Sequence, residues 1–107
     1  MITNIKGLLE FFILTIIKNE PQYGLEILER LKSADIQAHE GTVYPLLRKL
    51  KLSKQVETYT GESDVGPVRK YYDLTVLGKK RLEELNNEWK KLDQIVHKLR
   101  KPPYKNR

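Results

Sequence analysis

Four basic residues lie between Gly41 and Val56, and no acidic residue lies among them. They are Arg48, Lys49, Lys51 and Lys54. A guanidinium can donate two parallel hydrogen bonds to the edge of a guanine, whereas a lysine ammonium acts as a point charge that neutralises phosphate. This segment therefore has the chemistry needed to contact a nucleic acid.

The side chains of this segment suit different contacts. Arg48 is the residue we expect to read bases. Thr42 and Tyr44 can donate to a phosphate or contact a thymine methyl group. Lys49 and Lys51 are expected to neutralise phosphates, which adds affinity and salt dependence but no sequence information. An alternative for Tyr44 is packing against the hairpin that follows.

A second basic segment, residues 66–75, reads Gly-Pro-Val-Arg-Lys-Tyr-Tyr-Asp-Leu-Thr. Arg69 and Lys70 would lie beside the tip of a hairpin, where they could contact the minor groove or the flanking phosphates. The alternative is a solvated strand edge, where basic residues discourage aggregation. Because Tyr71 and Tyr72 alternate between faces of a strand, at least one of them is expected in the core.

A helix beginning near residues 40–42 would position the first segment. Its apolar residues form one inward stripe, and Pro45 is tolerated because the first turn of a helix has no partner for the missing N–H. The stripe consists of Val43, Leu46, Leu47 and Leu50. The opposite face is centred on Gly41, Pro45 and Arg48, and its small residues would let the backbone approach a surface closely. An ordinary solvated face is the alternative.

The remaining elements follow from hydrophobic periodicity and turn residues. The pattern predicts helices over residues 4–18 and 23–34, strands over 56–60 and 68–74 around a loop at 61–67, and a long helix capped by Thr75. This order predicts a mainly α fold with a β-hairpin. The expected organisation is a winged helix-turn-helix domain (1–74), a C-terminal dimerisation helix (75–101) and a basic, flexible tail (102–107).

Apolar residues in the long last helix step by three and four residues, which is typical of a coiled-coil seam. They are Leu82, Leu85, Trp89, Leu92, Val96 and Leu99. Pairing two such helices would bury the seam, most simply with twofold symmetry. The first helix is apolar over more than one face, so Leu8 and Phe11 are expected in the same interface. Alternatively, the seam packs back on its own domain.

Composition narrows the function classes. The 107 residues fit one domain, and their net charge is +6. Residues 1–74 carry ten basic and ten acidic residues, so the whole excess comes from residues 75–107, with ten basic and four acidic. The chain has no cysteine, and its apolar stretches are too short to cross a membrane, which fits the cytosol. We find no nucleophile triad, paired-carboxylate motif, phosphate-binding glycine loop or metal-ligand cluster, and therefore expect no enzyme, metal or cofactor.

Three motifs, in this order and spacing, resemble the PadR family of bacterial transcriptional regulators. They are Tyr23-Gly24, the run Glu40-Gly41-Thr42-Val43-Tyr44-Pro45, and the run Gly66-Pro67-Val68-Arg69-Lys70-Tyr71-Tyr72 with Leu74-Thr75. The resemblance covers about Leu8 to Leu99, and a single helix after the wing is similar to the compact subgroup. It implies a homodimeric repressor that binds a pseudo-palindromic operator and releases it on a small-molecule or stress signal. His39 departs from the usual small polar helix cap, and Ser53-Lys54-Gln55 lacks the glycine that often follows the third helix.

The role of the single tryptophan has two interpretations. Trp89 could pack in the core or at an interface. The resemblance implies a second role, because compact PadR-like regulators that respond to drugs use a tryptophan of this helix to stack on a flat ligand. Trp89, with Leu85 and Leu92 beside it, would then form a slot for a flat aromatic effector.

Two function hypotheses follow from the sequence. The first is a sequence-specific DNA-binding regulator of the kind just described. The second is a winged-helix protein-interaction module that acts through its heptad helix and binds DNA weakly. The acid-free basic stretch at 48–54, together with Arg69 and Lys70, favours the first.

Overall fold

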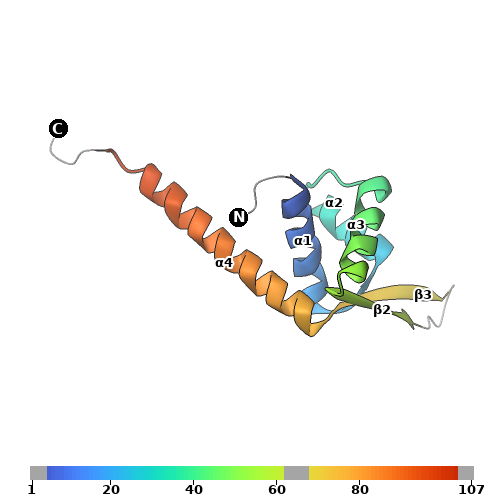
Figure 1. Cartoon of the computed structure of the whole chain (residues 1–107). Coiled ribbons are helices and arrows are strands. Elements are labelled where there is room, and N and C mark those ends of the chain that lie inside the picture. Colours follow the sequence, from blue (N-terminus) through green and yellow to red (C-terminus); the bar gives the residue numbers. More distant parts are fainter. Residues whose placement is uncertain (1–4, 62–67, 104–107) are drawn as a thin grey trace.

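The computed structural model describes residues 5–61 and 68–103 (Figure 1). Most of the predicted hairpin tip and the last four residues of the predicted tail lie outside these ranges. The mainly α fold with a β-hairpin is confirmed. In chain order the elements are α1 (Ile5–Asn19), β1 (Gln22–Tyr23), α2 (Gly24–Ser33), α3 (Glu40–Leu52), β2 (Val56–Gly61), β3 (Arg69–Leu74) and α4 (Val76–Leu99).

The core lies where α1, α2 and α3 meet and is closed by the sheet and by the first turns of α4. Each helix contributes the apolar face that its periodicity predicts. On α3 the predicted stripe is confirmed, because its four members are 0–7% exposed. The largest fully buried side chains of the whole core are Ile13, Leu14, Ile17, Ile27, Leu31, Leu47, Leu50, Leu82, Leu85, Val43 and Val56.

Helix α3 is held at both ends mainly by backbone groups. At its start the carbonyl of His39 accepts from the Thr42 and Val43 N–H groups, while the imidazole makes no capping bond. At its end Lys54 takes a left-handed conformation with φ of 61°, which glycine usually supplies. This lets the Gln55 N–H reach the Leu50 carbonyl at 2.9 Å. The chain thus reverses into β2 without the glycine that the resemblance implies there.

The sheet has three strands in the order β1-β3-β2, all antiparallel. Gln22 pairs with Tyr72 and Tyr23 with Tyr71, so β1 joins the wing to the start of α2. Periodicity predicts β2 and β3 but misses β1, because two residues are too few to show an alternating pattern.

Helix α4 begins at a junction with the end of α3. The Thr75 hydroxyl accepts from the Gly78 N–H at 3.0 Å and donates to the Lys54 carbonyl at 2.6 Å. Gly78 lies so close to this junction that a β-carbon added there would be 1.9 Å from the Gln55 carbonyl oxygen. The predicted Thr75 cap is confirmed, and it fixes the direction in which α4 leaves the domain.

Beyond its first turns α4 projects away from the rest of the chain (Figure 1). The molecule measures 68 × 28 × 22 Å and its radius of gyration is 17.3 Å, against roughly 13 Å for a compact domain of this length. The predicted seam on α4 therefore has a buried part and an exposed part. Leu82 and Leu85 are each 2% exposed and belong to the chain's own core, whereas Trp89, Val96 and Leu99 are 49%, 37% and 78% exposed.

Candidate nucleic-acid interface

The outer face of α3 is open and basic. Arg48 is exposed, as the sequence predicts for the face opposite the apolar stripe, and Thr42, Lys49 and Lys51 are exposed as well. At the start of this face a β-carbon added to Gly41 would meet no atom of the described residues within 4 Å. A flat or convex partner can therefore come close to the helix backbone there.

Tyr44 lies between α3 and the start of α2. Its ring is half-buried and packs over Gly24, where a β-carbon would lie 2.7 Å from Tyr44 Cε1. The Tyr23-Gly24 pair therefore leaves room for this ring. Of the two interpretations of Tyr44, packing is present in the structure, although its neighbour is the first turn of α2 as well as the wing.

Tyr72 of β3 lies beside the basic face of α3. Burial and the neighbouring Tyr44 raise the pKa of the Tyr72 phenol, while the Arg48 guanidinium lowers it. Because these effects act over short distances, side chains from α3 and β3 lie close together there. The two basic segments of the sequence thus meet on one side of the molecule.

A row of aromatic rings in the wing supports Arg69. The Arg69 guanidinium lies 4.4 Å from the centre of the Tyr23 ring. Tyr23 meets the edge of Tyr71 at 5.7 Å, and Tyr71 stacks on Tyr59 at 5.6 Å. The Tyr71 ring leans over Gly61, where a β-carbon would be 2.3 Å from its Cε2. Three strands thus each contribute one ring to a single row.

Sequence reasoning missed the part that Tyr23 plays. A cation above an aromatic ring is attracted to its negative face, and this attraction restricts where the guanidinium can go. The only available signal was Tyr23-Gly24 itself, a family motif that does not by itself identify the contact its tyrosine makes.

A shallow hollow of about 290 Å³ lies where α2, α3 and the wing come together. Arg69 and Lys70 contribute two cations to its lining, and among the described residues no carboxylate lines it. Its lining residues are Tyr23, Gly24, Leu25, Tyr44, Arg69, Lys70 and Tyr72. Cations and phenol hydroxyls are donors that suit phosphate oxygens, so the hollow can receive an anionic group of a nucleic-acid backbone.

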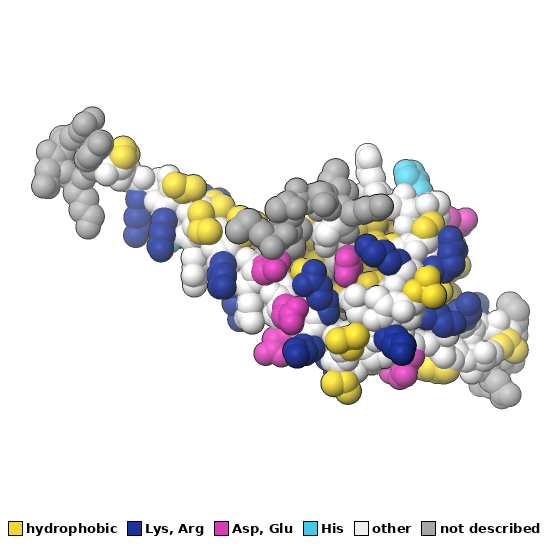
Figure 2. All heavy atoms as spheres, in the orientation of Figure 1, with side chains coloured by type: hydrophobic (Ala, Val, Ile, Leu, Met, Phe, Trp, Pro, Cys, Tyr) yellow, Lys and Arg dark blue, Asp and Glu magenta, His cyan; other side chains and the backbone are white. Residues whose placement is uncertain are grey.

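The predicted interface and ligand residues occupy two environments. Leu8, Phe11 and Leu92 are half-buried, and Leu85 lies in the core. Figure 2 shows apolar side chains along one edge of the projecting α4 and basic ones along the other. Of the three residues predicted to bind a ligand, Trp89 and Leu92 therefore offer surface, whereas Leu85 is buried in the core and offers none.

Other kinds of site are not found in the part of the chain that the structure describes. Within residues 5–61 and 68–103, no three His, Asp or Glu side chains come together in a group that could hold a metal ion. Among the described helices none has the length and apolar character that crossing a membrane requires.

Comparison with known proteins agrees with this architecture. A family model described as the transcriptional regulator PadR-like family matches residues 13–84. An uncharacterised protein of Lysinibacillus sphaericus is 35% identical over 95 residues, covering 86% of this chain and 87% of that protein.

Solved structures extend the similarity over the whole architecture. A PadR-like transcription factor from Bacteroides fragilis is 41% identical, with a TM-score of 0.77 and coverage of 88% of this chain and 91% of that one. A PadR-like transcriptional regulator from Bacillus cereus is 36% identical, with a TM-score of 0.81 and coverage of 92% and 96%. These relatives are transcription regulators, so the expectation of a non-enzyme is confirmed. The chain belongs to the PadR-like family of transcriptional regulators.

Proposed function

We propose that this regulator is a homodimeric repressor that binds a pseudo-palindromic operator through α3 and the wing. The observation that carries the proposal is the convergence of cations from α3 and β3 on one side of the molecule, around the phenols of Tyr44 and Tyr72. In this arrangement α3 enters the major groove, Arg48 reads a base, and Lys49 and Lys51 neutralise phosphates. Arg69 and Lys70 contact the backbone or the minor groove beside it.

A second copy of the chain is proposed as the partner of α4. The exposed apolar residues Trp89, Ile95, Val96 and Leu99 lie on a helix that extends beyond its own domain. A long helix with an exposed apolar stripe is unfavourable alone, and pairing with its twofold mate covers the stripe. The twofold axis would then relate two α3 helices, and half-sites about one helical turn apart would match them. Leu8 and Phe11 extend the proposed interface onto α1.

Release by a flat aromatic effector is the third part of the proposal. It rests on the exposure of Trp89 beside the half-buried Leu92, which would place two tryptophans near the twofold axis of a dimer. An effector stacked there would act only if it bound one arrangement of the two subunits more tightly than the other.

Fluorescence anisotropy of a labelled duplex from the gene's own upstream region tests the DNA part. The titration uses an unlabelled scrambled competitor at two salt concentrations. We expect tight binding that resists the competitor and weakens steeply with salt. Equal competition by the scrambled duplex would contradict a sequence-specific regulator and favour a protein-interaction module.

Two variants divide the roles on α3. Arg48→Ala should reduce discrimination between operator and scrambled DNA by about 1–3 kcal/mol. Lys51→Ala should lower the affinity for both duplexes equally. It should also reduce the slope of log affinity against log salt concentration by about one. Lys98→Ala removes an equal charge from the far end of α4 and is the matched control. If Arg48→Ala leaves the discrimination unchanged, Arg48 does not read a base.

A further inference from the structure

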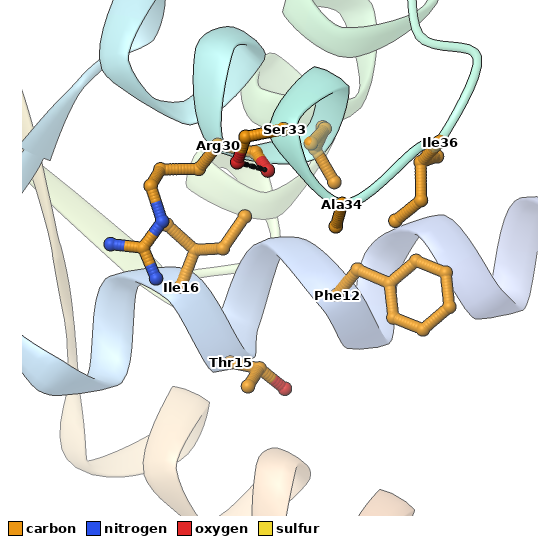
Figure 3. A pocket seen from close by; sticks show the side chains of 8 residues that line it. Phe12, Thr15, Ile16, Arg30, Ser33, Ala34 and Ile36 are labelled. Carbon is orange, nitrogen blue, oxygen red and sulfur yellow. Dashed lines mark hydrogen bonds between the residues drawn. The ribbon is translucent and has the colours of Figure 1, made fainter.

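A hollow between α1 and the end of α2 lies apart from the proposed DNA-binding surface and from Trp89. It has a volume of about 340 Å³, inside the roughly 300–1,000 Å³ range of small-molecule sites. Its lining is mainly apolar, with two hydroxyls and one guanidinium (Figure 3). The lining residues are Phe12, Thr15, Ile16, Arg30, Leu31, Ser33, Ala34 and Ile36.

The two ends of this hollow differ in chemistry. The Arg30 side chain extends from α2 toward Ile16 at one end, while the Phe12 ring lies with Ile36 at the other (Figure 3). Ala34 leaves space between them because its side chain is small. The hollow therefore offers a cation to one end of a guest and apolar contacts to the rest.

The Arg30 guanidinium is available for a guest. The sequence offers Glu26 four residues earlier, but Glu26 Oε1 accepts from the Tyr23 N–H at 3.1 Å instead. Among the described residues no carboxylate lies within ion-pair distance of Arg30, and none lines the hollow. The Ser33 hydroxyl donates its proton to the Arg30 backbone carbonyl at 2.8 Å.

We infer that this hollow binds a small amphipathic carboxylate, whose anionic head meets Arg30 and whose apolar body lies between Phe12, Ile16 and Ile36. Burial of the apolar body and a charge-assisted hydrogen bond would both favour binding. The end of α4 from a second copy is a poorer occupant. Residues 90–101 carry five basic residues and one acidic residue, so this segment would bring like charge toward Arg30.

Calorimetric titration with octanoate tests the inference, and octylammonium and octanamide serve as matched probes of opposite and zero charge. We expect octanoate to bind more tightly than octanamide and octylammonium to bind most weakly. Arg30→Gln should lower the affinity for octanoate about three- to tenfold and leave the affinity for octanamide unchanged. Lys32→Gln removes the same charge from the same helix, does not line the hollow, and should change neither.

A filling variant locates the site. Ala34 is exposed at the end of α2, so Ala34→Trp can occupy the hollow without disturbing the core, and circular dichroism checks that the variant folds. We expect this variant to lose octanoate binding. Binding that persists in Ala34→Trp, or equal binding of all three probes, would overturn the inference. So would an octanoate affinity that falls as the protein concentration rises through dimer formation, because a second copy would then occupy the hollow. None of these outcomes depends on DNA binding.

Discussion

Replacing Tyr23 with leucine should remove the aromatic ring that holds the Arg69 guanidinium in place. The ring holds the Arg69 guanidinium at 4.4 Å and meets the Tyr71 ring edge-on at 5.7 Å. An exposed cation–π contact contributes about 0.5–1 kcal/mol and an aromatic pair about 0.5–1.5 kcal/mol. We therefore expect Tyr23→Leu to lower the free energy of unfolding by about 1–2.5 kcal/mol. Tyr23→Phe keeps both ring contacts and should stay within about 0.5 kcal/mol of the parent.

The same change should affect DNA binding, because a guanidinium without its ring samples more positions before it meets the duplex. Tyr23→Leu should lower the affinity for the operator about three- to tenfold, while Tyr23→Phe should bind the operator as tightly as the parent protein does. Urea unfolding and anisotropy titration measure the two effects on the same samples.

A double-mutant cycle with Arg69→Met isolates the contact between the ring and the cation. Its coupling energy in urea unfolding should be about 0.5–1 kcal/mol. A coupling near zero, or equal losses from Tyr23→Leu and Tyr23→Phe, would refute the reasoning that the ring positions Arg69.

Three further predictions concern stability, pH and assembly. Gly78→Ala should destabilise the fold by about 3 kcal/mol in urea unfolding, because the added carbon meets the Gln55 carbonyl at 1.9 Å; the exposed Lys79→Ala beside it should cost little. Since the pKa of Tyr72 is raised in the folded state, the unfolded chain loses that proton first, so the free energy of unfolding should fall as pH rises above about 10. Tyr72→Phe should make that fall shallower, and an unchanged slope would contradict it. Trp89→Glu should shift sedimentation toward a monomer while urea unfolding still shows a folded domain, since Trp89 is 49% exposed; an unchanged dimer would place the interface elsewhere.

Helical and strand periodicity predicted most of the fold because those elements are long enough to repeat. The stripe on α3 recurs over two turns, and its members are buried as expected. The cap at Thr75 was predictable because a threonine between a strand and a helix has a local role. In contrast, β1 has two residues, and its existence depends on β3, which lies far away along the chain.

The sequence predicted which residues belong to the candidate site, but not which other residues they contact. Arg48 was placed on the outer face of α3 from helical rotation alone. The contact of Tyr44 with Gly24, and of Arg69 with Tyr23, depends on how α2 packs beside α3 and the wing. The seam on α4 illustrates the same limit, because a 3–4 spacing does not distinguish Leu85, which meets the chain's own core, from Leu99, which extends beyond it.

Because the base of α4 is fixed to the end of α3 at Thr75, a small rotation of the domain moves the far end of α4 by a larger distance. The bonds from the Thr75 hydroxyl to the Lys54 carbonyl and from the Gly78 N–H fasten the base of α4 to the end of α3. A helix of 24 residues is about 36 Å long, so a tilt of about 5° at its base moves its far end by about 3 Å. Conversely, a displacement of a few ångströms between two paired α4 helices would turn each α3 by only a few degrees. In the proposed dimer, this geometry would convert small sliding motions of α4 into a change in how the two α3 helices are aligned with the DNA grooves.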